Sequence, residues 1–115
     1  MNETLQNLVI LQDLDEMIAE LENTEVLSQQ EEMGFEIQGL EKLIDAREEL
    51  IKKIPPDIFH HYNRVRARYG RAIAPVRENI CLGCFIKIPT QISSREMGNK
   101  VLRNCENCGR YLYWV

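Results

Sequence analysis

The stretch from residue 81 to residue 108 begins and ends with a paired cysteine motif, Cys81-Leu-Gly-Cys84 at one end and Cys105-Glu-Asn-Cys108 at the other. Twenty residues separate the two pairs. A Cys-x-x-Cys pair forms a tight turn that points both sulfurs to the same side, so two such pairs can surround one tetrahedral ion. The spacing therefore predicts a zinc site whose ligands are Cys81, Cys84, Cys105 and Cys108.

Other uses of these cysteines are less well supported by the sequence. Disulfides need an oxidising compartment, and the first twelve residues lack the basic, apolar and small-residue regions of a signal peptide. A rubredoxin-like iron site and a redox dithiol stay open as alternatives to zinc. Four thiolates leave no coordination position for water, so we expect one structural Zn²⁺ per chain. We expect Gly83 and Gly109 to supply unusual backbone angles and close approach in the two turns.

Charge is divided unevenly along the 115 residues. Residues 1–56 carry four Lys/Arg against fourteen acids, a net charge of −10, and residues 57–115 carry ten against four, a net charge of +6. A basic region of this kind suggests an anionic partner such as nucleic acid, and a solvated charged surface explains it equally well. Because no run of 18 apolar residues occurs, we expect a cytoplasmic protein that does not enter a membrane.

The acidic half shows helical periodicity over residues 4–22 and 33–54. The heptad phases of the two segments do not match. Asn23-Thr24 is expected to end the first helix, and a capping box from Ser28 to Glu31 to start the second. The pattern favours an antiparallel coiled-coil hairpin with its tip near residues 23–28 over one continuous helix that pairs with a second chain. Its apolar stripes are expected at Ile10, Leu11, Leu14, Met17, Ile18 and Leu21, and at Ile37, Leu40, Leu43, Ile44, Leu50, Ile51 and Ile54.

A further helix is expected between Pro55 and Tyr69, since the two prolines end the arm and Gly70 can cap the next helix. This helix carries a stripe of arginines, whose guanidinium groups can bind phosphates in a bidentate manner. The same arginines could instead pair with the acidic N-terminal half of the chain. His60 and His61 are expected to be surface residues. We call residues 57–115 the basic head. Its candidate nucleic-acid contacts are Arg64, Arg68, Arg71, Lys87, Lys100, Arg103 and Arg110.

From Arg71 onward the apolar period changes to two. Residues 72–76 are predicted to form an edge strand because they contain a proline, and residues 100–103 and 111–114 to form two more strands. A loop or short helical turn is expected from Pro89 to Met97. The aromatic residues Phe85, Tyr111, Tyr113 and Trp114 either stack on nucleobases or cover the zinc site and the arm junction.

The predicted fold class is therefore α+β, with an N-terminal α-helical coiled-coil hairpin followed by a small C-terminal three-stranded zinc ribbon. We expect an acidic coiled-coil arm over residues 1–54, a basic connecting helix over residues 55–70 and the zinc ribbon over residues 71–115.

The segments 81–84, 88–91 and 105–114 resemble the bacterial four-cysteine zinc-ribbon proteins that carry an N-terminal coiled-coil hairpin. The likeness extends through residues 54–57 and 11–15 and so covers most of the chain. It implies a cytoplasmic, non-enzymatic protein whose ribbon and hairpin contact other macromolecules, including RNA or transcription components, with the four cysteines as zinc ligands. Compared with that family, this chain lacks a long middle stretch of the coiled coil.

Three functions are consistent with these features. In the first, an adaptor binds RNA or DNA through its basic head and a protein partner through its arm, as a monomer or a coiled-coil dimer. In the second, an RNA-polymerase-associated regulator acts through the coiled-coil tip, where Glu22 and Glu25 lie; in the third, the chain is a pure protein scaffold. We expect no enzymatic activity, because the sequence has no Ser-His-Asp set, no phosphate-binding glycine loop and no open metal position.

Overall fold

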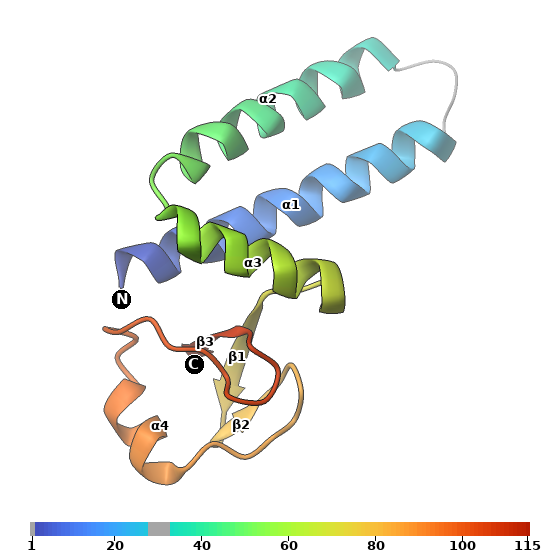
Figure 1. Cartoon of the computed structure of the whole chain (residues 1–115). Coiled ribbons are helices and arrows are strands. Elements are labelled where there is room, and N and C mark those ends of the chain that lie inside the picture. The colour runs from blue at the N-terminus through green and yellow to red at the C-terminus, as the bar shows by residue number, and fades with distance from the viewer. Residues whose placement is uncertain (1, 28–32) are drawn as a thin grey trace.

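The computed structural model describes residues 2–27 and 33–115 and shows a helical hairpin joined to a small ribbon (Figure 1). Helices α1 (Glu3–Leu27) and α2 (Met33–Ile51) lie antiparallel, and α3 (Pro56–Tyr69) crosses the base of the hairpin. The ribbon contains β1 (Ile73–Arg77), β2 (Ile80–Cys81), α4 (Thr90–Glu96) and β3 (Tyr111–Trp114). This architecture confirms the predicted α+β class and the intramolecular hairpin.

The tip of the hairpin differs from the prediction. Helix α1 continues through Asn23 and Thr24 to Leu27, so the expectation that it ends at those two residues is wrong. Asn and Thr cost a helix only a few tenths of a kcal/mol relative to good helix formers, about 0.7 at most, and neighbouring residues readily outweigh that cost. The capping box from Ser28 to Glu31 lies outside the described residues.

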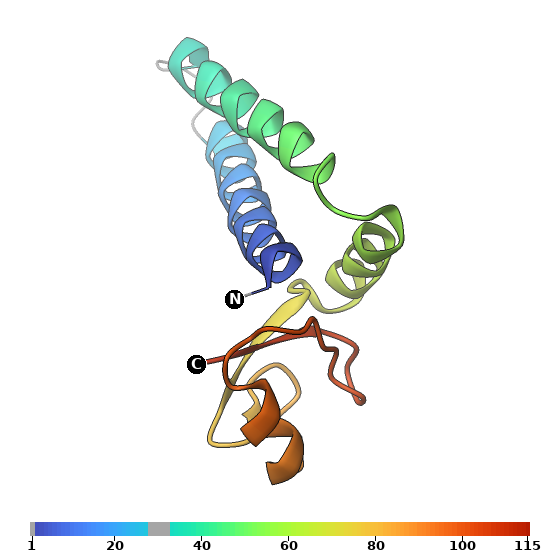
Figure 2. The ribbon, with the colours of Figure 1, turned by 90° about the vertical axis from the view of Figure 1, so that its left-hand side faces the viewer.

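The buried face of α1 also differs from the predicted stripe. Leu5, Leu8 and Leu11 are completely buried, whereas Ile10 and Met17 are 45% and 48% exposed, so their assignment to the stripe is wrong. The reason is that the first half of α1 packs against α3 and the start of β1 as well as α2, so a different face of the helix is covered (Figure 2). Further along the hairpin α1 and α2 pack on each other, and the predicted stripe residues Leu14, Ile18, Leu21, Leu40 and Leu43 are half-buried. Ile44 is 36% exposed, so its assignment to the stripe is also wrong.

A single apolar cluster joins the helices to the ribbon. It combines residues of α1, the α2–α3 connection, α3 and the sheet: Leu8, Leu11, Ile54, Tyr62, Val65, Ala72, Ile73 and Tyr111. Helix α3 begins after Pro55 and ends at Gly70, whose φ of 85° is left-handed and whose N–H donates to the Arg66 carbonyl at 2.7 Å, as predicted for a glycine cap.

The sheet has the order β2-β1-β3, so β1 is the central strand and its prediction as an edge strand is wrong. It pairs antiparallel with β2 and parallel with β3. Pro75 is accommodated because β2 pairs only with Val76 and Arg77, and the Pro75 carbonyl, on that same side, accepts from the Leu82 N–H at 3.0 Å. The missing N–H therefore interrupts neither ladder.

Residues 100–103 form no strand, which corrects a second prediction. They run beside β3, where the Arg103 carbonyl accepts from the Leu112 N–H at 2.8 Å, and the Asn99 side chain bonds both backbone groups of Trp114. The third strand is instead the two-residue β2, which is too short for its period to be seen in the sequence. Helix α4 occupies the segment where a helical turn was expected. No helix within residues 2–27 and 33–115 has the length and apolar character needed to cross a bilayer.

Candidate metal centre

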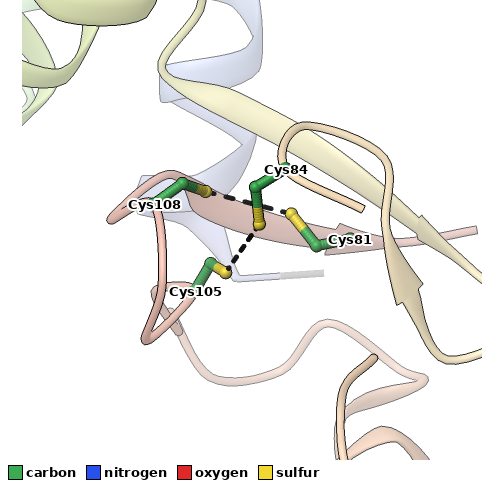
Figure 3. Close-up of side chains that lie close together, drawn as sticks. All are labelled: Cys81, Cys84, Cys105 and Cys108. Atoms are coloured by element: carbon green, nitrogen blue, oxygen red, sulfur yellow. Dashed lines mark hydrogen bonds between the residues drawn. The ribbon is translucent and has the colours of Figure 1, made fainter. Parts of the chain in front are cut away.

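The four cysteines meet in one cluster, which Figure 3 shows in close-up. Their sulfurs all lie within 4.8 Å of one another, with Cys84 and Cys105 at 3.6 Å and Cys81 and Cys108 at 4.0 Å. None of them forms a disulfide. A tetrahedral ion with metal–sulfur bonds of about 2.3 Å separates its sulfurs by about 3.8 Å, so the cluster has the dimensions of a four-thiolate metal site.

The two cysteine turns are built alike. In each, the residue after the second cysteine donates its N–H to the carbonyl of the first: Phe85 to Cys81 at 2.7 Å and Gly109 to Cys105 at 2.9 Å. The N–H of the first cysteine donates in turn to the next carbonyl, that of Ile86 or Arg110. We call residues 81–86 the first knuckle and residues 105–110 the second knuckle. Their shared geometry directs both sulfur pairs to the same point.

The glycines of the knuckles serve different needs. Gly109 has a φ of 80°, in the left-handed region that glycine occupies without steric cost, as predicted. Gly83 does not have a positive φ. A Cβ at Gly83 would lie 2.7 Å from the side chain of Arg110, so this glycine makes room for an arginine, and the expectation of an unusual backbone angle there is wrong.

Metal-free thiols in this cluster would differ strongly in acidity. Burial raises the pKa of Cys81 to about 12 and also raises the pKa of Cys105, although the amides of Gly83 and Cys84 donate to the Cys81 sulfur. At Cys84, burial acts in the same upward direction but is outweighed by donors including the Asn107 side chain and the Ile86 amide, which lower its pKa to about 6. A divalent cation would replace the protons and neutralise these thiolates together.

The second knuckle is tied to α3 through a histidine. His61 Nε2 lies 2.7 Å from the Gly109 carbonyl, and its ring meets that of Tyr111 edge-on at 5.2 Å. His61 is thus partly buried, which corrects its prediction as a surface residue, whereas His60 is exposed as expected. Nothing in the sequence distinguishes His61 from its neighbour His60, so the contact between His61 and Gly109 could be found only from the fold.

Two polar residues of α1, to which sequence reasoning gave no role, join this helix to the rest of the fold: Gln12 contacts the ribbon, and Asp15 contacts α2 and α3. Gln12 Oε1 accepts from the N–H groups of Ala72 and Ile73, both at 3.0 Å, where β1 begins. Asp15, only 5% exposed, accepts from Tyr62 Oη at 2.7 Å and from Arg47 Nε. The sequence signal that could have identified Gln12 and Asp15 is their position, three residues apart, within the apolar stripe of α1.

Three of the basic residues predicted to contact nucleic acid bind backbone or carboxylate oxygens of the chain. Arg110 is 8% exposed, donates to the Arg71 carbonyl at 3.1 Å and lies over the Tyr69 ring. Arg71 lies beyond the end of α3 and pairs with Glu16 at 3.1 Å, and Arg103 pairs with Glu96 at 3.2 Å.

The other four are exposed and bind no such oxygen among the described residues: Arg64, Arg68, Lys87 and Lys100. The Arg68 guanidinium lies over the Tyr69 ring at 5.2 Å. Arg64 and Arg68 stand one turn apart on α3 and border a hollow of about 270 Å³ beside the second knuckle, which His61, Val65, Tyr69, Cys108 and Gly109 also line. The structure therefore brings two of the seven predicted contacts together next to the cysteine cluster.

No family model matches this chain, and no curated protein matches it either. Similar solved structures include CT398 from Chlamydia trachomatis, at 27% identity and a TM-score of 0.57, and the HP0958 protein from Helicobacter pylori, at 26% and 0.63. They cover 70% and 72% of this chain, which spans only 34% and 35% of theirs. A protein from Mycobacterium smegmatis, at 24% identity and a TM-score of 0.53 over 72% of this chain and 36% of its own, shows likeness of fold alone. These are bacterial proteins of similar fold, and their names state no activity.

Proposed function

We propose that this chain is a non-enzymatic zinc-ribbon adaptor that binds the backbone of RNA or DNA through its basic head and a protein partner through its helical arm. One Zn²⁺ held by Cys81, Cys84, Cys105 and Cys108 would be structural, because the four thiolates fill a tetrahedral shell and leave no position for a reacting water. The donor set is all sulfur, which suits zinc and excludes the harder magnesium and calcium ions.

The observation that carries the nucleic-acid part is the hollow bordered by Arg64 and Arg68. Both guanidinium groups are exposed, and among the described residues no carboxylate forms an ion pair with either. His61 lies at the same site, with its Nδ1 3.5 Å from Arg64. Two arginines one turn apart at a concave surface can hold one or two phosphates by bidentate hydrogen bonds.

The arm supports a protein partner by its composition and exposure. Residues 1–56 carry a net charge of −10, which disfavours nucleic acid there. Ile10 and Met17, seven residues apart and therefore on one face of α1, leave about half of their side-chain surface open. Apolar groups exposed on an acidic helix fit a partner protein better than bulk water.

The test of the nucleic-acid part is the salt dependence of binding to a labelled RNA and to a DNA of the same sequence. Each neutralised phosphate adds about 0.7 to 0.9 to the slope of log affinity against log salt. We expect the double variant Arg64→Gln/Arg68→Gln to lower that slope by about 1 to 2 units. The matched control, Lys52→Gln/Lys53→Gln at the base of the arm, removes the same charge and should leave the slope unchanged. If the zinc-loaded wild type binds neither RNA nor DNA at low salt, the chain is a protein scaffold instead.

A further inference from the structure

Phe85 occupies a position in the first knuckle that the second knuckle gives to glycine. The two residues are equivalent, since each follows the second cysteine of its pair and donates its N–H to the carbonyl of the first. Both are left-handed, with a φ of 62° at Phe85 and 80° at Gly109. Glycine adopts this conformation freely, whereas a bulky aromatic residue with a positive φ is strained.

The fold gains little packing from Phe85 in return for this strain. Phe85 is 72% exposed, the highest value among the large apolar residues of 2–23 and 39–115. Leu82 and Ile86, in the same knuckle, are 39% and 41% exposed. A strained residue that its own chain does not bury points to a role in binding something else.

The occupant follows from the size and charge of this surface. Three neighbouring apolar side chains in a six-residue turn are far smaller than the roughly 800 Å² that each partner contributes to a standard protein interface, and they match the face of one nucleobase. The exposed Lys87 comes next in the chain and can meet the adjoining phosphate. The ribbon belongs to the basic half of the chain, with a net charge of +6, which favours an anionic ligand over an acidic protein.

We infer that the first knuckle is a stacking site for an unpaired base of a single-stranded nucleic acid, with the Phe85 ring as its platform and Leu82 and Ile86 at its sides. This rests on the nucleic-acid binding proposed above and adds a preference for single strands. Bases within a duplex are already stacked on one another and present no open face to Phe85. The phosphate contacts of Arg64 and Arg68 carry no such preference.

The experiment compares binding of zinc-loaded wild-type and variant proteins to a labelled oligouridylate of about twelve nucleotides and to an RNA duplex of the same length, by fluorescence anisotropy at low salt. Phe85→Leu keeps an apolar side chain but removes the ring, and we expect it to weaken single-strand binding by about 5- to 100-fold. Duplex binding should change less than about twofold, because phosphate contacts dominate it. Met97→Leu, at a side chain 67% exposed, is the matched control and should bind both probes like wild type.

Phe85→Gly gives a readout that is independent of binding. If the ring is strained and serves only a ligand, this variant should have a higher Tm than wild type and the same loss of single-strand affinity as Phe85→Leu. A lower Tm would mean that Phe85 packs the ribbon, and unchanged single-strand binding by Phe85→Leu would mean that no base stacks there; either result overturns the inference while the proposed function stands. Absence of binding by wild type to every probe overturns both.

Discussion

The junction between the hairpin and α3 depends on Asp15, and replacing it with alanine should be among the most damaging single changes outside the cysteine cluster. The carboxylate is 5% exposed and accepts hydrogen bonds from Tyr62 Oη and Arg47 Nε, with Arg66 Nε at 3.8 Å. Burial and this carboxylate hold the pKa of Tyr62 well above its usual value, so the hydroxyl stays protonated and needs an acceptor. Asp15→Ala removes the acceptor of both donors at once.

The cost can be estimated from the exposure of each donor. The completely buried Tyr62 cannot reach water, and an orphaned buried donor costs about 1 to 3 kcal/mol. Arg47 is 28% exposed and can recover part of its hydration. Losing its ion pair with Asp15 should therefore cost less than the 3 to 5 kcal/mol of breaking a fully buried pair. A total of about 3 kcal/mol, with a urea slope of about 1.5 kcal/mol per molar, shifts the unfolding midpoint by about 2 M.

Urea unfolding of the zinc-loaded protein, followed by circular dichroism, measures this shift. Glu16→Ala is the control, because its ion pair with Arg71 is exposed on both sides, 46% and 62%, and is worth no more than about 1 kcal/mol. Tyr62→Phe should fall between the two, at about 1.5 to 2 kcal/mol, since it loses one hydrogen bond to a charged acceptor while Arg47 still pairs with the carboxylate. If Asp15→Ala costs no more than Glu16→Ala, the junction is held by its apolar cluster and our account of Asp15 is refuted.

Three further predictions concern the metal, the knuckles and the sheet. Elemental analysis should find one zinc per chain, lost in Cys105→Ser together with the β structure of the ribbon, and iron in its place would contradict the assignment. Gly109→Ala should destabilise the protein by about 1 to 2 kcal/mol because its φ is 80°. The control Gly39→Ala lies in a helix with nothing within 4 Å of the added Cβ, and should stabilise the protein by up to about 1 kcal/mol. Equal effects of the two changes in thermal unfolding would argue against the left-handed turn. Gln12→Ala should cost about 2 to 4 kcal/mol by leaving the N–H groups of Ala72 and Ile73 without their acceptor, and Gln12→Glu, which keeps an oxygen there, should cost less.

The parts of the fold that could be predicted are those in which neighbouring residues carry the information. The cysteine spacing predicted that the four sulfurs would meet, and proline and glycine indicated both ends of α3. The buried face of α1 could not be predicted from its periodicity, since Ile10 and Leu11 are equally apolar and only the position of the ribbon decides which of them is covered. The central position of β1 could not be predicted for the same reason. Its proline restricts only one side of the strand, and its parallel partner on the other side, β3, pairs residues that lie 38 positions further along the chain.

The same long-range contacts explain why the candidate site could be predicted as a ligand set but not as a surface. A metal ligand can be recognised from its residue type and spacing, whereas the sequence does not distinguish an exposed arginine from a buried one. Arg110 is buried because Gly83 leaves room for its side chain against the first knuckle, from which it reaches the Arg71 carbonyl. Arg64 instead borders the hollow next to the second knuckle. Since His61 and Arg64 lie one turn apart on α3, the bond from His61 to Gly109 also fixes where that hollow opens. The position of the proposed phosphate site therefore depends on the second knuckle keeping its shape, and hence on the metal that the knuckle would hold.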